Sequence, residues 1–217
     1  LMLINFIYAL ILGVAHFISD KVAEHKYYKT EIRSFAAGLS ITYLLLYLLP
    51  ELYGGVVALE RLLFLFVLLG ATTFHLLEKY IYQHKKRNKL ILELKVFHAV
   101  FFFIYHFLIG IVLVSINAIN NIAGILFFIP ILFYTLVSQV SLSNLHAHIT
   151  EKIALRTLLS GSTLLGVILA TLWIIPTNLY FSLLAFIAGA LLYNVMVEVV
   201  PKEKEGNILF FLFGMIV

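Results

Sequence analysis

Three polar residues interrupt two long apolar stretches of the sequence. His106 stands in the stretch FHAVFFFIYHFLIG, and Ser138 with Gln139 stands in LFYTLVSQVSLSNLH. Counted from the basic ends of the two stretches, these residues lie at similar distances, so we expect them at one depth near the middle of a membrane. An imidazole beside hydroxyl and amide oxygens can bind a divalent metal ion. It can equally join two membrane helices by hydrogen bonds, and both interpretations stay open.

The other histidines gather toward one side. They fall near the basic ends of apolar stretches or in the basic connections, and they are His16, His25, His75, His84, His98, His146 and His148. His146 and His148 flank Ala147 and could hold a metal ion in passing, although solvated loop histidines are the commoner case. With His16 and His75 they form a candidate metal relay on this side of the membrane.

Glu198 is a carboxylate within an apolar stretch, one helical turn before Pro201. An ionised side chain costs about 2.5–3.5 kcal/mol at the centre of a membrane helix and less near its end. The side chain could simply extend to the membrane surface. The functional alternative is a metal ligand or a proton site within reach of His16 or His75.

The composition places these residues in a membrane protein. Of 217 residues, 63% are hydrophobic and 12% charged, with a mean hydropathy of +1.05. A spanning helix needs about 20 apolar residues. Seven such stretches lie near 2–19, 34–50, 57–78, 96–116, 122–145, 153–175 and 179–200. An eighth opens at Asn207 and reaches Val217, which is too short to cross, so we expect it to be truncated in this chain.

Two absences narrow the chemistry. The sequence contains no cysteine, which excludes disulfides, thiolate metal sites and iron–sulfur ligation. The first apolar stretch lacks a basic start and a small-residue cleavage site, so it is predicted to be a retained span and not a secretory signal.

The basic residues predict the topology. Fourteen of the fifteen Lys and Arg residues fall in the connections after spans one, three, five and seven, and Arg61 is the exception. The positive-inside rule makes that side the cytoplasm. We therefore expect eight spans in the plasma membrane, cytoplasmic basic loops, and both termini outside. The net charge of +4 is explained by these loops and gives no reason to expect nucleic acid as a partner.

Two segments of the chain repeat one pattern. FAAGLSITYLLLYLLPE covers residues 35–51 and FIAGALLYNVMVEVVPK covers 186–202, so Gly38 to Pro50 and Gly189 to Pro201 share one spacing. Under the predicted topology the two segments run in opposite directions. Inverted repeats of this kind are typical of secondary transporters. Small residues and proline are also common devices for packing and ending membrane helices, which is the alternative explanation.

Several segments resemble the ZIP family of divalent metal transporters. They are LLPE at residues 48–51, LLGATTFHLLEKYIYQH in the third span, LLSGSTLLGVILATL in the sixth, AGALLYNVMVEVVP in the seventh and NILFFLFGMIV in the eighth. The resemblance covers most of the chain. It implies one all-helical transmembrane domain over residues 1–217, with spans one to three and six to eight as inverted repeats around spans four and five. It also implies transport of a divalent ion such as zinc by alternating access.

The family's metal site lies on spans four and five, in motifs like HNxxD/EG and HExxH. Aligned on Gly110, Tyr105 takes the histidine position, His106 the asparagine position and Ile109 the carboxylate position. The second motif falls on Ser138, Gln139 and Ser141, and none of these side chains is a carboxylate. Since two carboxylates offset the charge of a dication in low dielectric, the resemblance implies a degenerate site that binds a dication weakly.

Other functions remain open. The fold could serve a sensor or regulator that transports nothing, with Tyr105, His106 and Gln139 as a fixed polar network. A haem b could lie between His75 and His98 or His106, as bis-histidine ligation requires. No GxSxG, HExxH or paired catalytic Asp occurs in the apolar spans, so we expect no enzyme. Membrane lipid and a divalent ion are the expected partners, no resident cofactor is expected, and a homodimer is allowed.

Overall fold

The computed structural model describes residues 2–24, 29–84, 87–145, 153–202 and 205–217. Within these ranges the side chains of 20–24, 29, 77–78, 81, 84, 87–95, 98, 138–145 and 198 are not described. The described chain is helical, in eight helical rods joined by short turns. Segments labelled α are α-helical, and the two labelled η are π-helical. In the order of the chain they are α1 (Met2–Glu24), α2 (Lys29–Tyr43), η1 (Leu44–Leu48), α3 (Leu49–Leu59), α4 (Leu62–His84), α5 (Arg87–Ile119), α6 (Asn121–Leu145), α7 (Ile153–Ser160), α8 (Ser162–Leu172), α9 (Thr177–Asn194), η2 (Val195–Val199) and α10 (Ile208–Ile216).

Within the part of the chain that the structure describes, five helices are long and apolar enough to cross a membrane. They cover Met2–Ser19, Thr30–Leu59, Ala99–Ile119, Ile153–Leu172 and Thr177–Val197. Shorter apolar stretches lie in α4 and α6, at Leu62–Leu76 and Asn121–Val137. Large apolar side chains also cover the outside, with Leu46 75% and Val57 92% exposed. An outer surface this apolar suits lipid, and the chain is an integral membrane protein.

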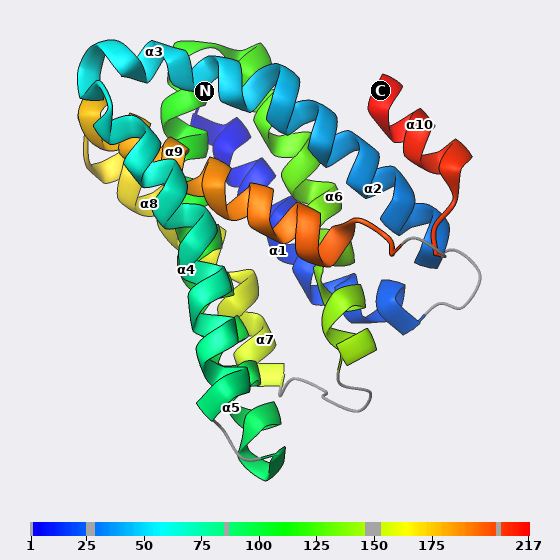
Figure 1. Cartoon of the computed structure of the whole chain (residues 1–217). Coiled ribbons are helices and arrows are strands. Elements are labelled where there is room, and N and C mark those ends of the chain that lie inside the picture. Colours follow the sequence, from blue (N-terminus) through cyan, green and yellow to red (C-terminus); the bar gives the residue numbers. More distant parts are fainter. Residues whose placement is uncertain (1, 25–28, 85–86, 146–152, 203–204) are drawn as a thin grey trace.

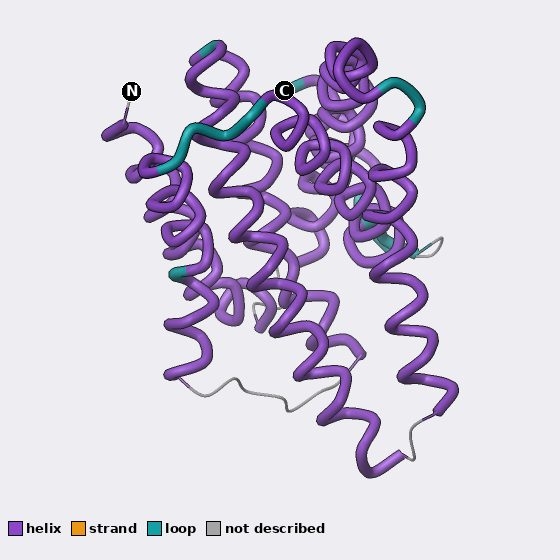
Figure 2. Tube along the Cα trace, turned by 90° about the vertical axis from the view of Figure 1, so that its left-hand side faces the viewer, coloured by secondary structure: helices purple, strands orange, loops and turns teal. Residues whose placement is uncertain are grey.

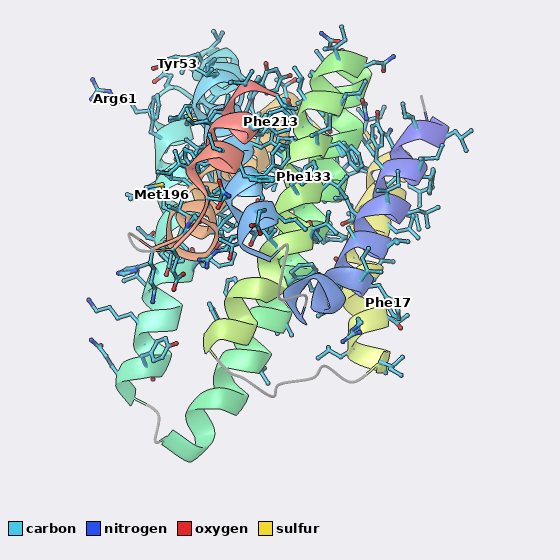
Figure 3. All side chains as sticks on the ribbon, turned by 90° about the vertical axis from the view of Figure 1, so that its right-hand side faces the viewer. Phe17, Tyr53, Arg61, Phe133, Met196 and Phe213 are labelled. Carbon is cyan, nitrogen blue, oxygen red and sulfur yellow. The ribbon has the colours of Figure 1, made fainter. Side chains whose placement is uncertain are left out.

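The termini of the helices lie at two opposite ends of the bundle (Figure 1). The ends of α4 and α6 and the starts of α5 and α7 lie toward one end, and the turn between α3 and α4 lies at the other. Figure 2 shows the same helical bundle after a quarter turn. Arg61 lies at the end opposite to the α4–α5 turn (Figure 3).

The helices pack in four principal pairs. They are α2 with α10, α4 with α9, α5 with α8, and α1 with α6. The segment α2 also contacts η2, while α9 contacts η1. Along the colour gradient of Figure 1, α2 and α9 run across the bundle in opposite directions. Partners in these pairs are distant in sequence, so the bundle is held by long-range contacts.

Glycines set the distance between the helices of three pairs, and in the pair of α5 with α8 they are Gly110 and Gly166. Gly38 of α2 and Gly214 of α10 each lie against the partner's backbone, where an added Cβ would overlap a carbonyl oxygen. Gly70 of α4 and Gly189 of α9 do the same. In each of the four cases the blocking oxygen belongs to the residue three positions before the partner glycine. The α2–α10 and α4–α9 pairs therefore repeat one contact geometry.

Each π-helical segment precedes a proline at the same offset. The N–H of Leu49 donates to the carbonyl of Leu44, and the N–H of Val200 donates to that of Val195 at 2.9 Å. Both bonds reach back five residues, as in a π turn. A proline cannot donate a backbone hydrogen bond and its ring crowds the carbonyl four residues earlier, and widening the preceding turn relieves that crowding.

Beyond the two prolines the segments differ. Leu49 keeps helical backbone angles, and the helix continues through α3 to Leu59, so the prediction that the second span ends at Pro50 is wrong. Val200 is extended, as the residue before a proline usually is, and the helix ends there. Arg33 of α2 donates to the freed carbonyls of Val199 at 3.0 Å and Val200 at 3.4 Å, which stabilises this end.

We expect Gly189→Ala to destabilise the protein by about 1–3 kcal/mol, because the added methyl group would overlap the carbonyl of Val67. Gly161→Ala is the matched control, since its Cβ would lie 3.5 Å from the nearest atom, the Leu158 carbonyl oxygen. Thermal unfolding in detergent measures both variants. Equal melting temperatures for Gly189→Ala and the unchanged protein would contradict the close approach of α4 and α9.

Candidate functional site

His106 lies in the interior of the bundle, on α5. Its side chain is 2% exposed. The ring nitrogen Nδ1 lies 3.3 Å from the hydroxyl oxygen of Thr163 on α8. The other nitrogen, Nε2, has no hydrogen-bond partner among the described residues. In the tautomer in which Nδ1–H donates to Thr163, Nε2 carries a free lone pair and can act as a metal ligand.

A second buried histidine lies close by. His16 of α1 is also 2% exposed. The ring of Phe102 stands between the two histidines, with its centroid 4.0 Å from that of His16 and 4.0 Å from that of His106. The structure therefore brings together one residue of the predicted metal site and one of the predicted relay. Helices α1, α5 and α8 meet at this point.

Tyr105 directly precedes His106 on α5 and packs against other helices. Its ring makes edge-to-face contacts with three other rings. The distances between ring centroids are 6.3 Å to Phe74 on α4, 6.0 Å to Tyr134 on α6 and 5.7 Å to His106. The side chain is 2% exposed, and its hydroxyl has no hydrogen-bond partner in the described part of the chain. A buried hydroxyl without a partner is unfavourable, so it marks a candidate functional group.

Two further polar residues were missed by the sequence analysis. Tyr43 and Asn194 each stand directly before a π-helical segment, seven positions ahead of Pro50 and Pro201. Both are buried, and within the described residues neither Tyr43 Oη nor Asn194 Oδ1 has a hydrogen-bond partner. The equal spacing in the two repeats was a signal that could have identified them. π-Helical turns often occur at functional sites.

The tyrosine hydroxyls extend the polar interior. Tyr43 lies within electrostatic reach of Tyr47, Tyr105, Tyr180 and Glu51. Tyr180 is 3% exposed, and its hydroxyl has no described hydrogen-bond partner. Helices α2, α5 and α9 thus direct neutral oxygen atoms into one region of the core.

An asparagine pair joins α1 to α5 farther along the bundle. The amide of Asn117 donates to the side-chain oxygen of Asn5 at 2.5 Å, and both residues are buried. Interhelical hydrogen bonds of this kind contribute about 0.6–2 kcal/mol in membranes. The pair fixes the relative height of α1 and α5, on which the position of His16 beside Phe102 depends.

Of the remaining predicted site residues, the structure describes the side chain of His75 and not those of the others. The side chains of Ser138, Gln139, His98 and Glu198 lie outside the described residues, as do His146 and His148. His75 is exposed, and its ring contacts Tyr193 on α9. His106 faces α1 and α8 instead. The alternative in which His75 and His98 or His106 hold one haem stays a prediction.

The described site offers neutral ligands. Over the described residues, no group of three or more His, Asp or Glu side chains could together hold a metal ion. His106 contributes nitrogen, and Thr163 and Tyr105 beside it contribute uncharged oxygen. Such donors compensate the lost hydration of a dication only in part. The arrangement suits weak and transient binding.

Comparison with known proteins gave no match to a family model, a curated protein or a solved structure.

Removing an unpartnered buried hydroxyl should stabilise the fold. We expect Tyr105→Phe to raise the free energy of unfolding by about 1 kcal/mol, because the hydroxyl no longer needs to be desolvated. Tyr53→Phe is the control, since Tyr53 is 67% exposed and the change should be neutral. Unfolding in detergent measures both. A loss of stability in Tyr105→Phe would mean that the hydroxyl is hydrogen-bonded in the folded protein.

Proposed function

We propose that this chain is a ZIP-like transporter that moves divalent metal ions across the plasma membrane by alternating access. In this proposal it has eight spans, both termini outside and its basic loops in the cytoplasm. The first and last three spans form inverted repeats around α5 and α6. His106, Tyr105, Ser138 and Gln139 form the midplane site.

One observation supports the proposal above the others. The two segments with equal Gly-to-Pro spacing have the same π turn, the same glycine contacts and a buried polar residue at the same position, Tyr43 or Asn194. Repeats that match in local structure but run in opposite directions can exchange conformations, and this exchange opens a transporter alternately to its two sides. The π turns are the places where each segment could bend.

A second function is favoured by a different observation. The described residues lack a cluster of three strong metal ligands. A sensor or regulator with the same fold would need no such cluster, and Tyr105 and His106 would then be a structural network. The two functions differ in one measurable property, which is the flux of metal ions.

The test is the flux of zinc, cadmium and iron(II) into proteoliposomes that contain a fluorescent chelator. We expect flux in the unchanged protein, a loss of about tenfold or more in His106→Ala because a ligand is removed, and a loss in Gln139→Leu. Tyr53→Ala is the control, because Tyr53 is 67% exposed and lies outside the proposed site and relay. Absence of flux for every ion, with the protein folded in the bilayer, would contradict transport and favour the regulator.

A further inference from the structure

A groove between α1 and the α7–α8 turn opens on the outer surface of the bundle. Its volume is about 290 Å³, near the lower end of the range for ligand pockets. Among the described lining residues Ser160 alone is polar, and its hydroxyl oxygen is buried. The groove therefore presents apolar surface to the surrounding lipid. The lining residues include Leu10, Gly13, Val14 and Phe17 of α1, with Gly161 and Leu164 across from them.

Two glycines form the floor of this groove. A Cβ added at Gly13 would lie 2.6 Å from the carbonyl oxygen of Ser160, so α1 and α7 approach each other closely at this level. A Cβ added at Gly161 would meet no atom closer than 3.5 Å, because the space beside it is open. Gly161 has a φ of −82° and a ψ of −10°, which other residues adopt as well. A larger side chain at Gly161 would therefore fit the backbone and fill the groove.

A cation stands at one end of the groove. Arg156 belongs to the first turn of α7, one helical turn before Ser160, and its guanidinium carbon lies 5.6 Å from the centroid of the Phe17 ring. Phe17 lies on the outside of the bundle beside α7 (Figure 3). This end of the groove is the one toward the basic α4–α5 connection, because α1 ends and α7 begins there (Figure 1). A cation–π contact uses the face of a guanidinium and an anion binds at its N–H edge, so the two contacts are compatible.

The groove and its cation have the polarity of a phospholipid in one leaflet. From Arg156 the apolar groove continues toward the middle of the membrane for about 12 Å, counted over residues 9–17 of α1 at 1.5 Å per residue. The exposed side chains of Leu10 and Val14 offer apolar surface to an acyl chain. A phosphate matches the planar fork of a guanidinium. A headgroup that carries its own cation would be repelled by Arg156, so an anionic headgroup is favoured.

We propose that the groove between α1 and the α7–α8 turn binds one anionic phospholipid, with its phosphate on Arg156 and an acyl chain lying over Gly161. The lipid comes from the leaflet at the basic end of the bundle. The basic connections attract anionic lipid to that end in general. The groove selects one molecule from this layer and holds it against two helices that are distant in sequence. The inference goes beyond the proposed function and does not depend on transport.

Native mass spectrometry of the purified protein in mild detergent tests the headgroup contact, because it counts the lipid molecules bound to each protein. We expect phosphatidylglycerol to bind about tenfold or more tightly than phosphatidylcholine with the same acyl chains. Arg156→Gln should lower the affinity for phosphatidylglycerol to near that for phosphatidylcholine. Lys79→Gln is the matched control, because Lys79 is exposed at the same end of the bundle and does not line the groove.

A second variant tests the position of the acyl chain. Gly161→Leu should weaken the binding of phosphatidylglycerol about tenfold or more, since the new side chain occupies the space of the acyl chain. Ala154→Leu is the matched control, because Ala154 is exposed on α7 and does not line the groove. Should Gly161→Leu not fold, Val14→Trp fills the groove from α1, where Val14 is 59% exposed.

Each part of the proposed site can fail by a separate result. Equal affinities of the unchanged protein for the two lipids would overturn the site, as would equal losses in Arg156→Gln and Lys79→Gln. A loss in Arg156→Gln without one in Gly161→Leu or Val14→Trp would show a contact at the membrane surface only, which overturns the groove as the place of binding. None of these results depends on the flux of metal ions, so the lipid site and the transporter are tested independently.

Discussion

The close approach of helix backbones at paired glycines is the constraint on which the rest of this structure depends. Lipid is as apolar as the helix surfaces, so burial of apolar area does not draw membrane helices together as it does in water. Contact between backbones must supply the attraction instead. At Gly38 with Gly214, and at Gly70 with Gly189, nothing larger than a hydrogen atom fits between the helices. These contacts fix α2 and α9 within the bundle, and so fix the polar residues that they carry.

The π turns follow from the same segments. Each turn lies six residues beyond its glycine and widens the helix just before a proline. The glycine holds one half of the segment against its partner helix, while the widened turn lets the other half take a different direction. Tyr43 and Asn194 stand where the two halves meet. A buried polar residue at this position responds to any bending of the segment, which is what a transporter of the proposed kind requires.

Much of this fold could be predicted because a membrane restricts the choices of the chain. Apolar stretches must be helices when no water is present to satisfy their backbone groups. The equal spacing of Gly38 to Pro50 and Gly189 to Pro201 identified the two segments that share a local structure. The continuation of the helix past Pro50 could not be foreseen, because the same sequence signal is followed by extended backbone at Val200. That difference depends on the tertiary surroundings of each proline.

The site was less predictable than the fold for a related reason. His106 and Tyr105 stood out as polar or aromatic positions in a motif, and the structure places both in the core. Phe102 lies one turn before His106 on α5, a spacing that brings the two side chains together, but His16 comes from α1 and Thr163 from α8, and no spacing along the chain indicates that these two meet His106 or its neighbour. Phe102 also resembled the apolar residues around it. Only its position between two imidazoles distinguishes it from the neighbouring phenylalanines.

The neutral character of the described site bears on how it could work. A pathway conducts only when binding is strong enough for the ion to enter and weak enough for it to leave. Carboxylates would deepen the binding of a dication, and the described core offers histidine, hydroxyl and amide groups in their place. Neutral donors offset less of the lost hydration of a dication than carboxylates do, so the transport proposed for this chain would depend on brief occupancy of the site.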